Sequence, residues 1–198
     1  MKKLLILIIT ICLVNCSDKK EDKTIYKNHE IPFLNASIKL PENYDLITLE
    51  EYGEIIKNNY SDTLFIKNKL LSIEQFKLNH IEYLMFCDNE NIDNNITIVP
   101  AINPTVNEWV KEKLADYIIS SMRDRGNDEN FKYKNLQNKL IDERMIKIKG
   151  KIVYDKTSEK GFYSTQYLAN GWAIGFSAFV NNSSDVDFEK ELTEIKYN

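Results

Sequence analysis

The chain contains few of the residues that hold metals or act as nucleophiles. Its 198 residues include two histidines, His29 and His80, and three cysteines. A zinc site needs three or four clustered ligands of these types; the sequence has no such cluster, so we expect no metal. His80 and Cys87 are seven residues apart. In a continuous strand that separation places them about 23 Å apart on opposite faces, which argues against a His–Cys catalytic pair.

Glycine is also scarce and scattered. The six glycines form none of the spacings GxGxxG, GxxxxGK[ST] or GxSxG, which cradle a phosphate or present a nucleophilic serine. The acidic stretch from Asp88 to Asp93 lacks the central glycine and the final glutamate of a calcium-binding loop. We therefore expect no cofactor and identify no catalytic residue.

Charge of one sign is not concentrated anywhere in the chain. Lysine and arginine total 26, aspartate and glutamate total 30, and the formal net charge is −4. A surface that binds nucleic acid gathers its basic residues in a patch or stripe, and these charges are mixed throughout. We therefore expect no nucleic-acid partner.

The apolar run near the N-terminus is too short to cross a membrane. Leu4 to Val14 spans 11 residues and follows Lys2 and Lys3, whereas a helix that spans a bilayer needs about 20. This arrangement is typical of a cleavable export signal. The run ends in Leu13-Val14-Asn15-Cys16, which resembles a bacterial lipobox.

The lipobox resemblance implies that Cys16 is a lipidation site. Diacylglycerol is then transferred to the Cys16 sulfur, the chain is cut before Cys16, and the new amine is acylated. The predicted partner of this segment is a membrane, reached through the lipid on Cys16. Cys12 leaves with the signal peptide, residues 1–15, so Cys87 remains without a disulfide partner. We expect Cys87 to be a small buried residue.

Residues 16–30 are predicted to be a flexible tether because they are polar and lack apolar periodicity. Lys20-Glu21-Asp22 resembles the export tag of surface lipoproteins from Bacteroidetes, and a solvated charged linker is the alternative interpretation. The expected location is the bacterial cell envelope at the outer membrane, with the surface-facing leaflet left open. A single domain is predicted over residues 31–198.

Two helical segments are expected in the first half of the domain. Thr48 and Glu51 fit a capping box that begins one helix, and residues 62–76 hold a second. The strongest helix pattern covers about residues 106–123, with Thr105 and Glu108 as its expected capping box. Its expected apolar stripe consists of Val106, Trp109, Val110, Leu114, Tyr117, Ile118 and Met122.

Alternating patterns predict the strands. They cover residues 36–40, 80–87, 96–99, 146–154, 161–169 and 172–180, with a short helix after Ser184. Lys147, Lys149 and Lys151 alternate with isoleucines, which predicts a lysine face toward water. Asn170-Gly171 predicts a type I′ hairpin turn.

The hairpin is the predicted ligand-binding element. Tyr163 and Tyr167 share one strand face, and Phe179 lies on the returning strand beside Gly175 and Ser177, whose small size leaves room for a ligand or a closely packed helix. We name Tyr163, Tyr167 and Phe179 as candidate binding residues; the alternative is that these aromatic side chains form core.

The order of elements predicts an α+β fold, an antiparallel sheet with helices packed on it. A long capped helix, an aromatic hairpin and a short terminal helix resemble the PsbP-like α/β/α sandwich. The favoured function is a membrane-anchored, non-catalytic binding or accessory domain, with an envelope protein or a small ligand as partner. An envelope hydrolase that uses carboxylates, and an immunity or inhibitor lipoprotein, remain the alternatives.

Overall fold

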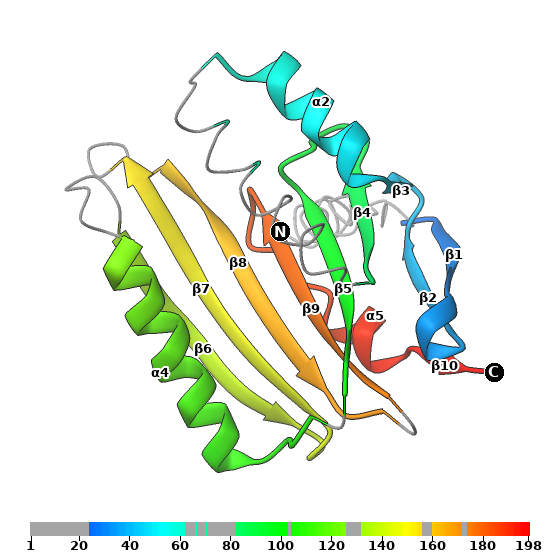
Figure 1. Ribbon diagram of the computed structural model, residues 1–198, viewed down its shortest axis with the longest axis vertical. Helices are drawn as coiled ribbons and strands as arrows, with labels where there is room; N and C mark the ends of the chain where they lie inside the picture. The colour runs from blue at the N-terminus through cyan, green and yellow to red at the C-terminus, as the bar shows by residue number, and fades with distance from the viewer. Residues whose placement is uncertain are drawn as a thin grey trace, which may run out of the picture.

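Two antiparallel sheets and three α-helices make up the described part of the chain in this computed structural model (Figure 1). The structure describes residues 24–61, 66, 70, 82–102, 104–125, 132–155, 160–171 and 174–198. Four features of the sequence lie outside these residues: the predicted signal peptide, the predicted lipidation site Cys16, most of the predicted helix over residues 62–76, and His80.

The larger sheet has seven strands in the order β3-β4-β5-β9-β8-β7-β6, each antiparallel to its neighbours. Its members are β3 (Tyr44–Ile47), β4 (Leu84–Asp88), β5 (Asn95–Ala101), β6 (Lys132–Ile141), β7 (Met145–Asp155), β8 (Lys160–Ala169) and β9 (Gly175–Asn182). With helices on its faces, this sheet confirms the predicted α+β class.

The smaller sheet contains β1 (Tyr26–Ile31), β2 (Ala36–Pro41) and the two-residue strand β10 (Lys196–Tyr197), with a 3₁₀ turn η1 (Pro32–Leu34) between β1 and β2. Strand β1 pairs with β2 from Tyr26 onward. The predicted tether over residues 16–30 was therefore too long: its last five residues belong to a strand. Strand β1 is exposed along most of its length, so its side chains are mostly polar and lack the apolar alternation that predicts a strand.

Helix α2 (Leu49–Asn59) begins as predicted. The Thr48 side chain accepts a hydrogen bond from the Glu51 backbone N–H, and the Glu51 carboxylate accepts one from the Thr48 backbone N–H. These bonds satisfy amide groups that the first turn of a helix leaves without partners. Leu49, Tyr52 and Ile56 then pack on Met85 and Cys87 of β4.

Helix α4 (Glu108–Arg125) begins later than predicted. Asn107, and not Thr105, caps it, because the Asn107 side chain accepts a hydrogen bond from the Val110 backbone N–H at 2.8 Å. Ala115 and Ile118 pack on Ile146 and Ile148 of β7, so α4 lies along β6 and β7 (Figure 1). Two expected stripe residues face solvent instead: Trp109 is 66% exposed and Tyr117 is 69% exposed.

The opposite face of the large sheet carries the main core. Phe86, Ile96 and Ala178 of the large sheet pack against residues of the smaller sheet, such as Ile38 and Leu40, and against the C-terminal segment. That segment includes the short helix α5 (Glu189–Thr193). The predicted terminal helix is shorter than expected, but Phe188, Leu192 and Ile195 share a buried face as predicted.

The lysine face of β7 does not point to water, which corrects the prediction. Lys147 is 3% exposed and Lys149 is 7% exposed. An acidic segment from Asp185 to Glu189, the first residue of α5, covers them. The Lys147 ammonium lies 2.7 Å from Asp187 and 2.8 Å from Glu189, and the Lys149 ammonium lies 2.5 Å from Asp185. Alternation along β7 was correct, but both of its faces are covered, one by α4 and one by this acidic segment.

The turns at the end of the sheet also differ from the prediction. Neither Asn170 nor Gly171 has a positive φ, and Ala169 pairs with Phe176, so Asn170 and Gly171 do not form the predicted two-residue type I′ turn. Positive φ occurs instead at Asp142 and Glu143, between β6 and β7. Strand β6 itself was not predicted, because most of its side chains are polar and exposed.

Candidate functional site

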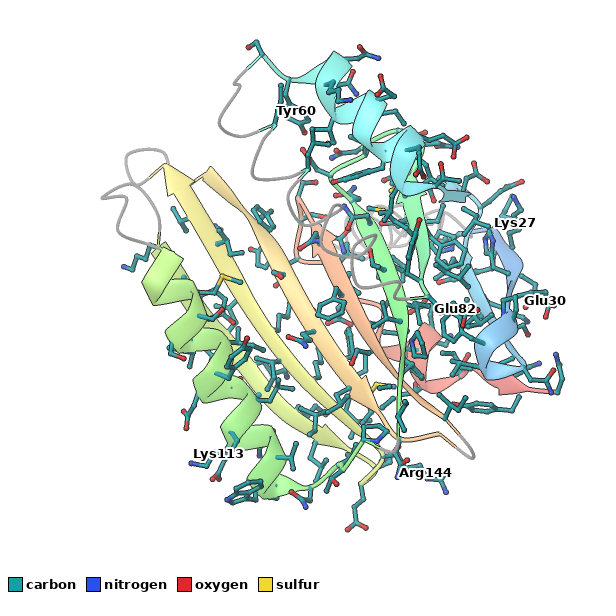
Figure 2. All side chains as sticks on the ribbon, in the orientation of Figure 1. Lys27, Glu30, Tyr60, Glu82, Lys113 and Arg144 are labelled. Atoms are coloured by element: carbon teal, nitrogen blue, oxygen red, sulfur yellow. The ribbon has the colours of Figure 1, made fainter. Side chains whose placement is uncertain are left out.

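A cavity of about 680 Å³ lies where β6 turns into β7, where β8 ends and where β9 begins. Helix α5 and strand β10 close it on the side of the smaller sheet. Figure 2 shows Arg144, one of its lining residues, at this lower end of the sheet. The volume falls within the roughly 300–1,000 Å³ of typical small-molecule sites.

The turn between β6 and β7 supplies two charged residues to the cavity, Asp142 and Arg144. Ile141 pairs with Met145, and the Arg144 backbone N–H donates to the Ile141 carbonyl at 3.0 Å. Asp142 and Glu143 have φ of 47° and 56°, a conformation that aspartate and asparagine adopt more readily than most residues. The Asn170 backbone N–H donates to the Arg144 carbonyl at 2.8 Å and ties the turn to β8.

The inner wall of the cavity is apolar and belongs to the main core. Its side chains come from β7, β9 and the C-terminal segment, and each is less than a tenth exposed: Ile141, Met145, Phe176, Leu192 and Ile195. Because these side chains already pack against one another, the wall is held in place before any ligand arrives. A bound apolar group would displace water from this wall, which favours binding.

The rim of the cavity is polar. Asp142, Arg144, Asn170, Thr193 and Tyr197 reach it. Within the described part of the chain, neither the Arg144 guanidinium nor the Asp142 carboxylate forms an ion pair or a side-chain hydrogen bond. The arrangement of an apolar wall below a few polar groups is the usual form of a site that fixes the orientation of a small ligand.

Gly171 and Tyr197 shape one side of the rim. A Cβ atom on residue 171 would lie 2.0 Å from the Ile174 carbonyl oxygen and 3.2 Å from the Tyr197 hydroxyl, so only glycine fits this position without a backbone shift. Partial burial raises the pKa of Tyr197 above its usual value, which keeps its hydroxyl protonated and able to donate a hydrogen bond.

The three predicted binding residues are not brought together. Tyr163 and Tyr167 lie on the face of β8 that carries the lysines of β7, with Lys147 5.9 Å from the Tyr167 ring centroid and Lys149 5.8 Å from that of Tyr163. Phe179 pairs with Gln166, so it lies on the other face. Tyr167 is fully buried, which agrees with the alternative interpretation that it is a core residue.

Space beside Gly175 is already occupied. A Cβ atom there would lie 2.3 Å from the Ala169 carbonyl oxygen and 2.4 Å from Cγ of Pro104. Gly175 therefore lets the chain before α4 and the backbone of β8 approach β9. None of Tyr163, Tyr167 and Phe179 lines the 680 Å³ cavity, and their predicted role in ligand binding stays a prediction.

Other reactive side chains lie away from the cavity. Cys87 is 3% exposed. Burial lowers the pKa of His29, and the nearby Lys27 ammonium lowers it further. Among the residues that the structure describes, no three His, Cys, Asp or Glu side chains are placed to hold a metal ion, and no helix has the length and apolar character to cross a membrane.

Sequence reasoning missed the residues of the cavity. Its most informative signal was the group Asp142, Glu143 and Arg144 between Ile141 and Met145, which marks a tight turn between two apolar strand ends. That signal indicates a turn, but it does not reveal that α5 and β10, about 50 residues later, close over it. The cavity depends on this contact between distant segments of the chain.

Comparison with known proteins identifies the fold and no family. Neither protein-family models nor curated proteins give a match. Among solved structures, the chain is similar to cyanobacterial PsbP (CyanoP) from Synechocystis sp. PCC 6803, with a TM-score of 0.51 and 6% sequence identity. The match covers 93% of this chain and 99% of that chain. At this identity the similarity concerns the fold alone, and it confirms the PsbP-like fold expected from the order of elements.

Proposed function

We propose that this chain is a lipid-anchored protein of the bacterial cell envelope whose folded domain is a non-catalytic binding or accessory module. The lipobox-like sequence ending at Cys16 supports the anchor. The described domain begins its first strand at Tyr26, so nine residues, 17–25, lie between the proposed anchor at Cys16 and that strand. An extended chain of that length reaches about 35 Å at most, so the domain works close to the membrane surface.

The observation that carries the binding role is the cavity near Arg144. It combines a prepacked apolar wall with a polar rim. The envelope hydrolase alternative calls for several carboxylates in one pocket, with environments that drive their pKa values apart. The lining of this cavity contributes one carboxylate, Asp142. The geometry therefore favours binding over acid–base chemistry.

Plugging the cavity tests the binding role. Thr193 lines the cavity on α5, and its hydroxyl bonds only to backbone carbonyls of the same helix. We expect Thr193→Trp to fill the opening with little loss of stability. A set of small amphipathic compounds is screened by ¹H saturation-transfer NMR against the wild-type chain and against Thr193→Trp. Compounds that bind the cavity show saturation transfer with the wild type and lose it with the variant.

Lys190→Trp is the matched control, because Lys190 is an exposed residue of the same helix that does not line the cavity. We expect this variant to bind the same compounds as the wild type. Compounds that bind equally to Thr193→Trp would show that another surface is responsible. A screen in which nothing binds the wild-type chain would contradict the proposed function.

A further inference from the structure

We propose that the cavity takes a short peptide with free termini and bulky apolar side chains, a ligand that is zwitterionic at neutral pH. This inference rests on the proposed binding function and names the ligand class of the same cavity. It follows from three features of the lining: one cation, one anion and an apolar wall.

The two charges of the rim determine the ligand's charge. Asp142 and Arg144 come from the same turn, both line the cavity, and within the described residues they do not pair with each other. A ligand whose only charge is a carboxylate is attracted by Arg144 and repelled by Asp142. A ligand whose only charge is an ammonium group is attracted by Asp142 and repelled by Arg144. A ligand that carries both groups can satisfy both side chains, and charge-assisted hydrogen bonds are the strongest of the polar contacts.

The charged residues around the cavity leave Asp142 and Arg144 available to a ligand. Lys139 acts on Asp142 through space, but its ammonium is bonded to Glu189 at 2.6 Å. Glu189 in turn accepts from Lys147 at 2.8 Å. Lys147 also pairs with Asp187 at 2.7 Å, so these two lysines and two carboxylates balance their charges within the network. Asp142 and Arg144 remain the charged side chains that line the cavity itself.

The wall and the volume favour a peptide over a single polar zwitterion. Met145, Phe176, Leu192 and Ile195 line the inner wall, where each leaves less than a tenth of its surface exposed. Each Å² of apolar ligand surface that contact with this wall removes from water gains about 25 cal/mol. A volume of about 680 Å³ exceeds what one amino acid fills. Free backbone groups of the ligand also find hydrogen-bond partners on the rim, at Asn170 and the Tyr197 hydroxyl.

Three related probes separate the charge requirements in isothermal titration calorimetry with the full chain. Leu-Leu carries both charges, N-acetyl-Leu-Leu carries only the carboxylate, and Leu-Leu amide carries only the ammonium group. We expect Leu-Leu to bind about tenfold more tightly than either of the other two, because each loses one charge-assisted hydrogen bond.

Asp142→Asn and Arg144→Gln assign the two contacts. Asparagine tolerates the positive φ of 47° at residue 142, so Asp142→Asn keeps the turn. We expect each variant to weaken Leu-Leu about tenfold. Asp142→Asn should leave the affinity of N-acetyl-Leu-Leu unchanged or improve it. Lys113→Gln, on the exposed side of α4 away from the cavity (Figure 2), should leave all three affinities unchanged.

The outcomes separate this inference from the proposed function. If N-acetyl-Leu-Leu binds more tightly than Leu-Leu, the site takes a monoanion and the zwitterion inference is wrong, while the binding function stands. If other compounds from the screen bind the cavity and Leu-Leu does not, the inference is also wrong. If Asp142→Asn leaves the affinity for Leu-Leu unchanged, the ammonium contact with Asp142 is ruled out.

Discussion

Lys147 shows how a charged residue can be buried on one face of a sheet. Its ammonium contacts Asp187 and Glu189 and lies 5.9 Å from the Tyr167 ring centroid. Burial of a charge is costly unless partners with good geometry surround it. Burial also disfavours the charge on Lys149, but the hydrogen bonds to Asp185 and Asp187 outweigh that effect and raise its pKa.

The carboxyl groups of this network predict an acid-sensitive fold. Burial alone would raise the pKa of Asp187, but hydrogen bonds from Lys147 and from the Glu189 backbone N–H outweigh it and lower the pKa. Hydrogen bonds from Lys139 and Lys147 lower that of Glu189. A carboxyl whose pKa is lowered in the folded state stabilises the fold above its unfolded pKa, and this contribution is lost as the pH falls through the folded pKa.

We therefore expect the free energy of unfolding, measured by urea denaturation, to fall between about pH 5 and pH 3. Asp187→Asn should lower it by about 1–2 kcal/mol at pH 7 and flatten its dependence on pH. Asp116→Asn, at an exposed position of α4, should change neither. An unaltered pH profile in Asp187→Asn would show that the network does not govern acid stability.

Sequence patterns predicted the alternation of these residues but not their burial. Lys147 and Lys149 alternate with Ile146 and Ile148 as a half-exposed strand would. The segment that covers them begins at Asp185, more than 30 residues later. Which face of a strand is covered depends on tertiary contacts, and a pattern within the strand carries no information about them. For the same reason, the pattern of β8 did not decide whether Tyr167 lines a groove or belongs to the core, where the structure places it.

At the scale of elements, the helix starts illustrate what local signals can show. The capping box at Thr48 was predicted from a four-residue pattern and is present in full. The same pattern at Thr105 was misleading, because Asn107 offers its side chain two residues later. Asparagine is at least as good a cap as threonine, and the N-cap of α4 is the later of the two residues, Asn107.

This difference predicts the effect of two substitutions. Asn107→Ala should lower the free energy of unfolding by about 1 kcal/mol, because the Val110 N–H loses its partner. Thr105→Ala, at an exposed position before the helix, should change it by less than about 0.5 kcal/mol. Both are measured by urea denaturation, and the reverse order of the two effects would show that Thr105 caps α4.

Helix geometry explains why two aromatic side chains of α4 are exposed. Trp109 and Tyr117 are eight positions apart, so they lie on one face of the helix, and the stripe that contacts β7 is narrower than expected. The periodicity correctly identified the helix and the inner residues Val110, Leu114 and Ile118. It could not show how wide a stripe the sheet covers.

At the scale of the whole molecule, the α+β class and the PsbP-like fold could be predicted because they follow from the order of elements. Strands β1 and β6 escaped prediction because their exposed polar side chains lack the apolar alternation that marks a strand. The cavity was not predicted because it forms between the turn at Asp142 and the C-terminal residues near Tyr197, which are distant in the sequence. Its location depends on how the fold closes, which no local pattern contains.

The proposed lipid anchor on Cys16 is the central claim about where this domain works, and metabolic labelling tests it most directly. The full-length chain is expressed in a bacterium that processes lipoproteins and is labelled with radioactive palmitate. We predict that the wild type and Cys12→Ala take up label and fractionate with membranes, because Cys12 leaves with the signal peptide. Cys16→Ala should take up no label and should accumulate as the uncleaved precursor. Labelled, normally cleaved Cys16→Ala protein would contradict the account.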